Sequence, residues 1–76
     1  MSHNSVDKLV KMANQIATFF TAQKSGDPVA GMAEHLAKFW EPRMRAAIIE
    51  HAAHGGAGLD PFALEGVKRL PPVSVG

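Results

Sequence analysis

The sequence has no cysteine and no tyrosine, and it has a single tryptophan among its 76 residues. The absence of cysteine excludes disulfides, thiolate metal sites and cysteine-ligated iron–sulfur clusters in this chain. No apolar stretch approaches the roughly 20 residues that a membrane-spanning helix needs. The formal net charge is only +1, and charges of both signs are interspersed. Nothing in this pattern favours nucleic acid or an anionic membrane as a partner.

The length allows one small domain, residues 1–76. A chain this short buries only about 60% of the surface that its unfolded form exposes, which makes it marginally stable alone. Because disulfides are excluded, another protein is the expected support. Residues 1–4 lack the basic and then apolar pattern of a signal peptide, so a cytoplasmic location is expected.

Apolar residues recur at helical spacing throughout, and no strand pattern appears. The sequence therefore predicts an all-α fold, a small bundle of three main helices plus a short fourth C-terminal helix. The helices are expected at about 5–24, 28–41, 42–54 and 61–70, with 71–76 as a loose tail. Asp27-Pro28 and Asp60-Pro61 mark two helix starts, since Asp caps and Pro suits the first position. Gly55 suits the left-handed residue that ends a helix.

Not every side chain fits a simple division of each helix into one apolar and one polar face. Apolar residues of the first helix cover an arc of roughly 180°, wider than one neighbour can cover, and Asn14 falls on its polar side. The second helix has a buried stripe that is expected to end in Phe39 and Trp40. Ile49 lies off the apolar face of the third helix, so it meets either a different element or a partner. Phe62 lies apart from the apolar stripe of the fourth helix.

Residues 38–45 connect the second and third helices and contain the only tryptophan. At helical spacing, Phe39 and Trp40 are most simply core residues. Alternatively, Trp40 with Arg43 and Arg45 forms an interface anchor, because Trp and Arg are enriched at binding hot spots. The two interpretations are compatible in a corner whose aromatic residues pack inward and whose arginines point outward.

Other polar patterns give no catalytic, cofactor-binding or metal site. His51 and His54 are spaced to share a metal, but a pair alone is not a site, and a helix C-terminus, where histidine suits the dipole, explains them better. Further metal ligands would have to come, without defined spacing, from His35, Glu50 or His3. Residues 55–58 are glycine-rich but lack the Lys-Ser/Thr of a phosphate-binding loop, so a hinge is expected there.

Enzymatic and DNA-binding functions find equally little support. Glu41 and Glu50 are not placed in one cleft, and no hydroxyl has the context of a nucleophile. A DNA-reading helix needs several outward basic residues, whereas Arg43 and Arg45 lie about 160° apart on the wheel.

Three stretches carry a family resemblance in a fixed order: 14–20 with Asn-Gln-Ile and Phe-Phe, 39–45 with Phe-Trp-Glu-Pro-Arg-Met-Arg, and 55–61 with Gly-Gly-Ala-Gly-Leu-Asp-Pro. The chain resembles the delta subunit of bacterial NAD-dependent formate dehydrogenase from about Val6 to Leu70. The resemblance implies a non-catalytic accessory subunit that docks on and stabilises, or helps assemble, a cytoplasmic molybdenum-containing complex. It also implies that the molybdenum cofactor, iron–sulfur clusters, FMN and NAD belong to partner subunits.

The partner that the resemblance implies is the catalytic alpha subunit. A self-associating helical module and a transient maturation chaperone of the catalytic subunit stay open as alternatives. The residues expected at the partner interface are Phe39, Trp40, Pro42, Arg43, Arg45, Ile49, Gly55, Gly56, Gly58 and Phe62.

Overall fold

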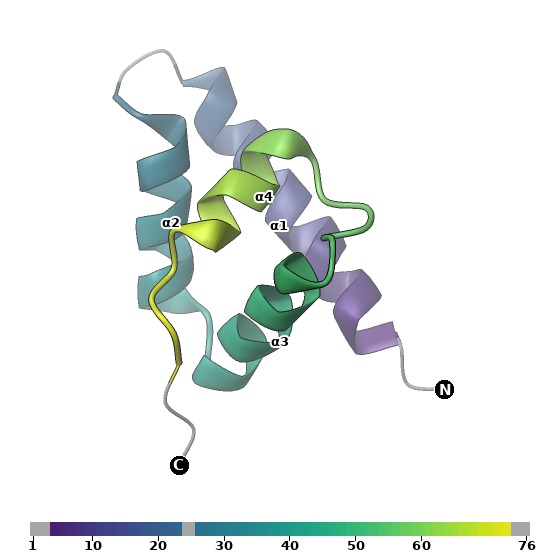
Figure 1. The fold of residues 1–76 in the computed structure, drawn as a ribbon. Helices are drawn as coiled ribbons and strands as arrows, with labels where there is room; N and C mark the ends of the chain where they lie inside the picture. Colours follow the sequence, from purple (N-terminus) through teal and green to yellow (C-terminus); the bar gives the residue numbers. More distant parts are fainter. Residues whose placement is uncertain (1–3, 24–25, 74–76) are drawn as a thin grey trace.

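The computed structural model describes residues 4–23 and 26–73, which form four helices. They are α1 (Asn4–Ala22), α2 (Pro28–Phe39), α3 (Pro42–Ala53) and α4 (Pro61–Lys68), shown in Figure 1. The predicted all-α class, with three main helices and a short fourth, is confirmed. Among the described residues, none of the helices combines the length and the hydropathy that a membrane crossing requires.

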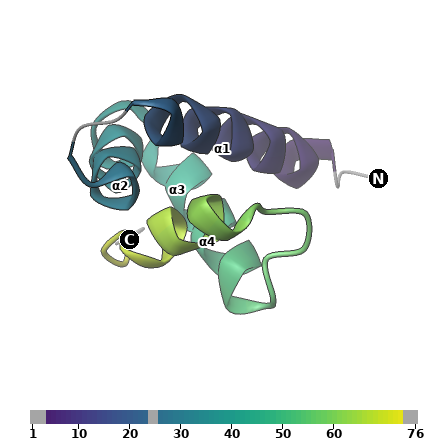
Figure 2. The same cartoon turned by 90° about the horizontal axis from the view of Figure 1, so that it is seen from above.

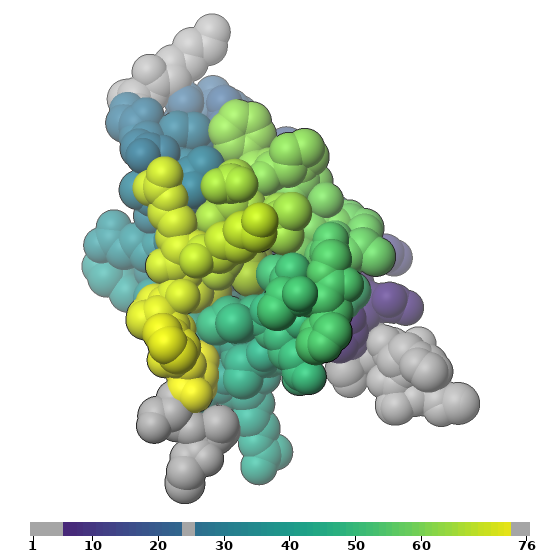
Figure 3. All heavy atoms as spheres, viewed as in Figure 1, coloured from purple at the N-terminus to yellow at the C-terminus, as the bar shows by residue number. Residues whose placement is uncertain are grey.

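The short helix α4 holds the bundle together. It packs against each of the other three helices, as α1 does, and Figure 2 shows it beneath α1 and beside α2. The space-filling view in Figure 3 shows α3, α4 and the segment that follows α4 forming one continuous face in front of α1. The Cα radius of gyration is 11.7 Å, close to the value of about 11 Å for a compact chain of this length.

The core takes residues from all four helices at helical spacing. Its buried members are Leu9, Ala13, Ala17, Met32, Leu36, Trp40, Ile48, Ala52, Ala63, Val67 and Leu70. Gly66 lies where α4 approaches α2, and a Cβ at this position would be 2.7 Å from the Sδ of buried Met32. A glycine that weakens the isolated helix therefore permits its close approach to α2.

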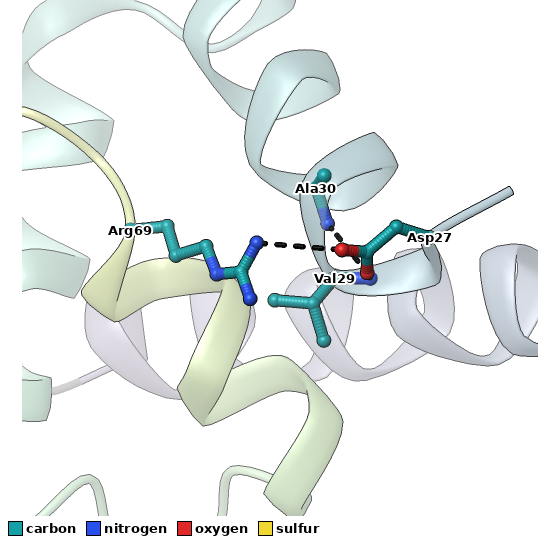
Figure 4. Close-up of polar contacts among 4 residues, drawn as sticks. All are labelled: Asp27, Val29, Ala30 and Arg69. Atoms are coloured by element: carbon teal, nitrogen blue, oxygen red, sulfur yellow. Dashed lines mark hydrogen bonds and ion pairs between the residues drawn. The ribbon is translucent and has the colours of Figure 1, made fainter.

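Two helix ends confirm the capping signals of the sequence. The Asp27 carboxylate accepts hydrogen bonds from the Val29 and Ala30 N–H groups at 3.0 and 3.3 Å (Figure 4). At the end of α3, the Gly56 N–H donates to His51 O and the Gly55 N–H donates to Ala52 O. This is the Schellman arrangement, and Gly55 has the positive φ, 108°, that the motif places after the last helical residue.

The helix boundaries differ from the expected ones by one or two residues. Helix α2 ends at Phe39, because Trp40 and Glu41 are extended, with ψ of 141° and 153°. Proline disfavours helical geometry in the residue before it, and here the extended stretch begins one residue earlier still. Of the expected loose tail, residues 74–76 lie outside the described part of the chain.

Two assignments of side chains to faces were wrong. Phe39 is 71% exposed, because it is the last residue of α2 and projects beyond the buried stripe that it was expected to close. Asn14 was expected on the polar side of α1, but it is half-buried because its side chain binds the loop before α4. Ile49, whose surroundings the sequence left open, is partly buried and packs against the core.

Candidate functional site

The part of the corner that follows Phe39, residues 40–45 and called the corner from here on, uses its second arginine to hold the chain itself. The Arg45 guanidinium donates to Ala37 O at 3.0 Å and to Trp40 O at 2.8 Å. These carbonyls end α2, where a cation also suits the helix dipole. The expectation that both arginines point outward was therefore wrong for Arg45, whereas Arg43 is exposed. Trp40 is 5% exposed and belongs to the core.

A second polar contact, here called the loop clamp, joins Asn14 to Gly58 and Asp60. The Asn14 Nδ2 donates to Gly58 O, and its Oδ1 accepts from the Asp60 N–H, both at 2.9 Å. One amide thereby satisfies a donor and an acceptor of the loop that leads into α4. Asp60 makes no side-chain cap of its own helix, unlike Asp27. The same Asp-Pro pair therefore starts two helices by different contacts.

The two histidines at the end of α3 hold backbone carbonyls. His51 Nε2 lies 2.8 Å from Ala57 O, and His54 Nδ1 lies 2.9 Å from Glu50 O. A carbonyl oxygen only accepts, so each of these ring nitrogens carries the proton. Within 4–23 and 26–73, no group of three His, Cys, Asp or Glu side chains is placed to hold a metal ion. His51 thus ties α3 to the glycine-rich connection, whereas His54 binds a carbonyl of α3 itself.

The ten residues expected at an interface are spread over different environments. Phe39, Phe62, Pro42, Arg43, Gly55 and Gly58 are exposed, and Arg45 and Ile49 are half-buried. Trp40 and Gly56 are buried. Phe62 lies in the first turn of α4, whereas Phe39 ends α2, and neither is buried in the core. The set therefore mixes residues that shape the fold with residues that are free to contact another molecule.

Three of the four large hydrophobic side chains that are exposed among the described residues lie on α1 and α2, and the fourth, Phe62, is on α4. We call the surface on α1 and α2 the aromatic face and define it as Met12, Ile16, Phe19, Phe20, His35 and Phe39. Its rings form a row: Phe19 meets Phe20 at 5.2 Å, Phe20 meets His35 at 6.0 Å, and His35 meets Phe39 at 4.8 Å between ring centroids. Phe19 is 59% exposed and Met12 is 39% exposed.

A hollow of about 330 Å³ opens on the aromatic face, lined by Gln15, Ile16, Phe19 and His35. Two further hollows, of about 270 Å³ each, are more polar. One lies by Arg45 and residues 71–73, and the other by Val6 and the two histidines of α3. Neither brings together the acid, base and nucleophile that a catalytic site requires.

One ion pair joins α4 to the start of α2. The Arg69 guanidinium lies 3.5 Å from the Asp27 carboxylate (Figure 4). The hydrogen bond from the Ala30 N–H, together with the Val29 N–H and Arg69, holds the pKa of Asp27 below its usual value, although desolvation opposes this shift. The ionised carboxylate therefore serves both as helix cap and as tether.

Sequence reasoning missed the aromatic face, although one signal for it was present. The apolar arc of α1 is wider than a single contact needs, and its inner half supplies Leu9, Ala13 and Ala17 to the core. Met12, Ile16 and Phe19 follow each other at spacings of four and three residues on the outer half. An apolar arc that is wider than the part buried in the core therefore indicates a second apolar surface.

Comparison with known proteins gives one positive result. No curated protein and no solved structure matches the chain. The family model described as NADH-dependent formate dehydrogenase delta subunit FdsD matches residues 8–67. The match includes Asn14 and its clamp partners, the corner and all of the aromatic face. The chain therefore belongs to the family of formate dehydrogenase delta subunits.

Proposed function

We propose that this chain is a non-catalytic accessory subunit of a cytoplasmic, multi-subunit, NAD-dependent formate dehydrogenase. It docks on the catalytic alpha subunit and stabilises it or assists its assembly. The observation that carries the proposal is the family match over 8–67, most of the chain. In this proposal the molybdenum cofactor, the iron–sulfur clusters, FMN and NAD are held by the other subunits. The absence of cysteine leaves this chain without the usual cluster ligands.

The polar contacts of the described residues support a scaffolding role. Asn14, Arg45, His51 and His54 each bind backbone atoms of this chain. These contacts hold a small fold in one shape, and they leave no polar cluster arranged for chemistry. The exposed rings of Phe19 and Phe39 supply apolar area that another subunit can cover. Such binding would stabilise both partners by mass action.

Deletion of the gene tests the proposal. We expect cells without this chain to contain less assembled and less active formate dehydrogenase, with full recovery when the gene is restored. Undiminished, fully assembled enzyme in the deletion strain would refute the proposal.

Purification of the mature enzyme then separates a permanent subunit from a maturation chaperone. A subunit remains with the alpha subunit at constant stoichiometry through size-exclusion chromatography. A chaperone is found only with the immature alpha subunit. We expect this chain to remain with the mature enzyme as a permanent subunit. Recovery of mature, active enzyme without this chain would instead identify it as a chaperone.

A further inference from the structure

We propose that the aromatic face binds an amphipathic helix of the catalytic subunit, one whose apolar side covers Phe19 and Phe39 and whose carboxylates meet Lys8 and Lys11. This inference rests on the proposed function, and it adds which surface binds and what chemistry that surface recognises.

The apolar part of the site is continuous: Met12, Phe19 and Phe39 are exposed, and Ile16 and Phe20 pack against the edge of the core. Met12, Ile16 and Phe19 run along α1, and the ring row carries the surface across His35 to Phe39 on α2. Phe19 and Phe39 are 59% and 71% exposed, the two highest values among the large exposed hydrophobic residues. The hollow beside Phe19 and Ile16, of about 330 Å³, is large enough to receive a bulky apolar side chain. Aromatic side chains next to such a pocket are typical binding hot spots.

The N-terminal end of this surface is basic. Lys8 precedes Met12 by one helical turn, and Lys11 precedes Gln15 of the hollow by one turn. Both lysines are exposed, and neither takes part in the two ion pairs found among the described residues, Lys38–Glu34 and Arg69–Asp27. At 100° per residue, Asp7 lies farther round α1 from Met12 than either lysine. Charge complementarity therefore calls for carboxylates on the partner at this end.

The geometry favours a helix as the bound segment. No strand edge exists in residues 4–23 and 26–73, so pairing by an added strand has no template there. From Lys8 to Phe19 the surface spans about 16 Å along α1, which corresponds to three turns of a facing helix. A helix with apolar residues at spacings of three and four and with acidic residues beside them at one end would cover this length.

A second copy of this chain fits the surface less well. In an antiparallel α1–α1 contact, Lys8 and Lys11 would oppose the C-terminal half of the other α1. Asp7 is the only carboxylate in α1, and it lies in the N-terminal half. Glu34 and Asp27, the acidic residues at the other end, are already paired. The lysines would gain no partner from a copy of the chain.

Binding of the full chain to the immobilised alpha subunit, purified from cells that lack this chain, tests the inference. The double variant Phe19→Ser with Phe39→Ser should bind about 30-fold more weakly or worse, as expected for loss of two central aromatic anchors. Phe62→Ser is the matched control, because Phe62 is 47% exposed and lies at the start of α4. The sequence placed Phe62 at the interface, but it lies outside the aromatic face, so this inference expects Phe62→Ser to bind as the wild type does. All variants should retain the wild-type circular dichroism.

Charge reversal tests the basic end separately. Lys8→Glu with Lys11→Glu should slow association several-fold and flatten its dependence on salt, because rim charges act mainly on the association rate. Lys68→Glu, which reverses an exposed charge on α4, should leave the rate near that of the wild type. Equal rates for the double reversal and for Lys68→Glu would overturn the electrostatic part of the inference.

The outcomes separate this inference from the proposed function. If the wild-type chain does not bind the alpha subunit at all, the proposed function fails. If the wild type binds and the double phenylalanine variant binds equally well, docking stands and the assigned surface is wrong. Sedimentation gives the third outcome. If the wild type is a dimer and the double variant is a monomer that still binds the alpha subunit, a second copy covers the face and the inference is overturned.

Discussion

Two parts of this small protein use conspicuous residues for opposite purposes. The corner and the loop clamp turn Trp40, Arg45 and Asn14 inward, onto the core and onto backbone atoms. The aromatic face turns Phe19 and Phe39 outward, where the described residues leave more than half of each side chain exposed. The most distinctive stretch of the sequence therefore shapes the fold, and a less distinctive apolar arc supplies the exposed surface. Mutations should separate the two parts by their effect on stability.

The largest effect is expected at the corner. Trp40→Ala should destabilise the chain by about 3–5 kcal/mol, the usual cost of removing a buried aromatic side chain, since Trp40 is 5% exposed. This is comparable to the whole stability of a small domain, so thermal melting should begin near room temperature.

The control for this change is Trp40→Phe, which retains an aromatic ring and should lose much less stability than Trp40→Ala. A wild-type melting curve for Trp40→Ala would contradict the placement of Trp40 in the core. Because the variant is expected to unfold, its loss of partner binding would say little about an interface.

The loop clamp should rank second. Asn14→Ala leaves a part-buried Asp60 N–H and the Gly58 carbonyl without their side-chain partner. We expect a loss of about 2 kcal/mol in the free energy of unfolding, measured by urea titration. Gln15→Ala is the matched control, because Gln15 is the exposed neighbour and should change stability by less than about 0.5 kcal/mol. Equal midpoints for the two variants would show that the clamp does not stabilise the fold.

The two arginines of the corner give a smaller and more selective comparison. Arg45→Ala removes two hydrogen bonds to the carbonyls that end α2 and should cost about 1 kcal/mol, since the contact is only half-buried. Arg43→Ala should be within about 0.5 kcal/mol of the wild type because Arg43 is exposed. If both variants lose the same stability, the inward role assigned to Arg45 alone is wrong.

The sequence predicted the helices better than it predicted their surfaces. Periodicity, Asp27-Pro28 and Gly55 identified all four helices to within about two residues at each end, because these signals act locally. The orientation of Arg45 depends on a carbonyl 5 residues earlier, across the end of α2. The clamp by Asn14 depends on backbone atoms 44 and 46 residues later in the chain. Local patterns carry no information about such contacts.

The candidate surface was the hardest part to predict. Phe39 fits the helical spacing of a buried stripe, yet the helix ends at this residue and the ring lies outside the core. Helical periodicity identifies an apolar face without showing how much of it the rest of the chain covers. That depends on how the four helices pack against one another.

Acidification should weaken the tether between α2 and α4. Hydrogen bonds from Ala30 and Val29 and the nearby Arg69 lower the pKa of Asp27 in the folded chain. A lowered folded pKa means that this stabilisation is complete above the pKa of the unfolded chain, about 3.9. It is lost as the pH falls through the folded pKa.

Melting temperatures measured from pH 6 down to pH 2, roughly across that window, should therefore fall less steeply for Asp27→Asn than for the wild type. Glu65→Gln, at an exposed position of α4, is the control and should follow the wild-type curve. The effect should be small because the carboxylate is exposed to solvent. Parallel curves for wild type and Asp27→Asn would show that the cap and the ion pair do not contribute.

The smallest effect on folding is expected where the surface inference is strongest. Phe39→Ser removes a ring that is 71% exposed and whose closest ring neighbour is His35, one turn earlier in the same helix. Such an i, i+4 contact contributes only about 0.2–0.5 kcal/mol, so the urea midpoint should barely move. The same substitution should weaken binding to the alpha subunit, if the aromatic face docks there. A loss of stability above about 1 kcal/mol would instead assign Phe39 to the fold, as in the corner, and would remove the distinction between the two regions.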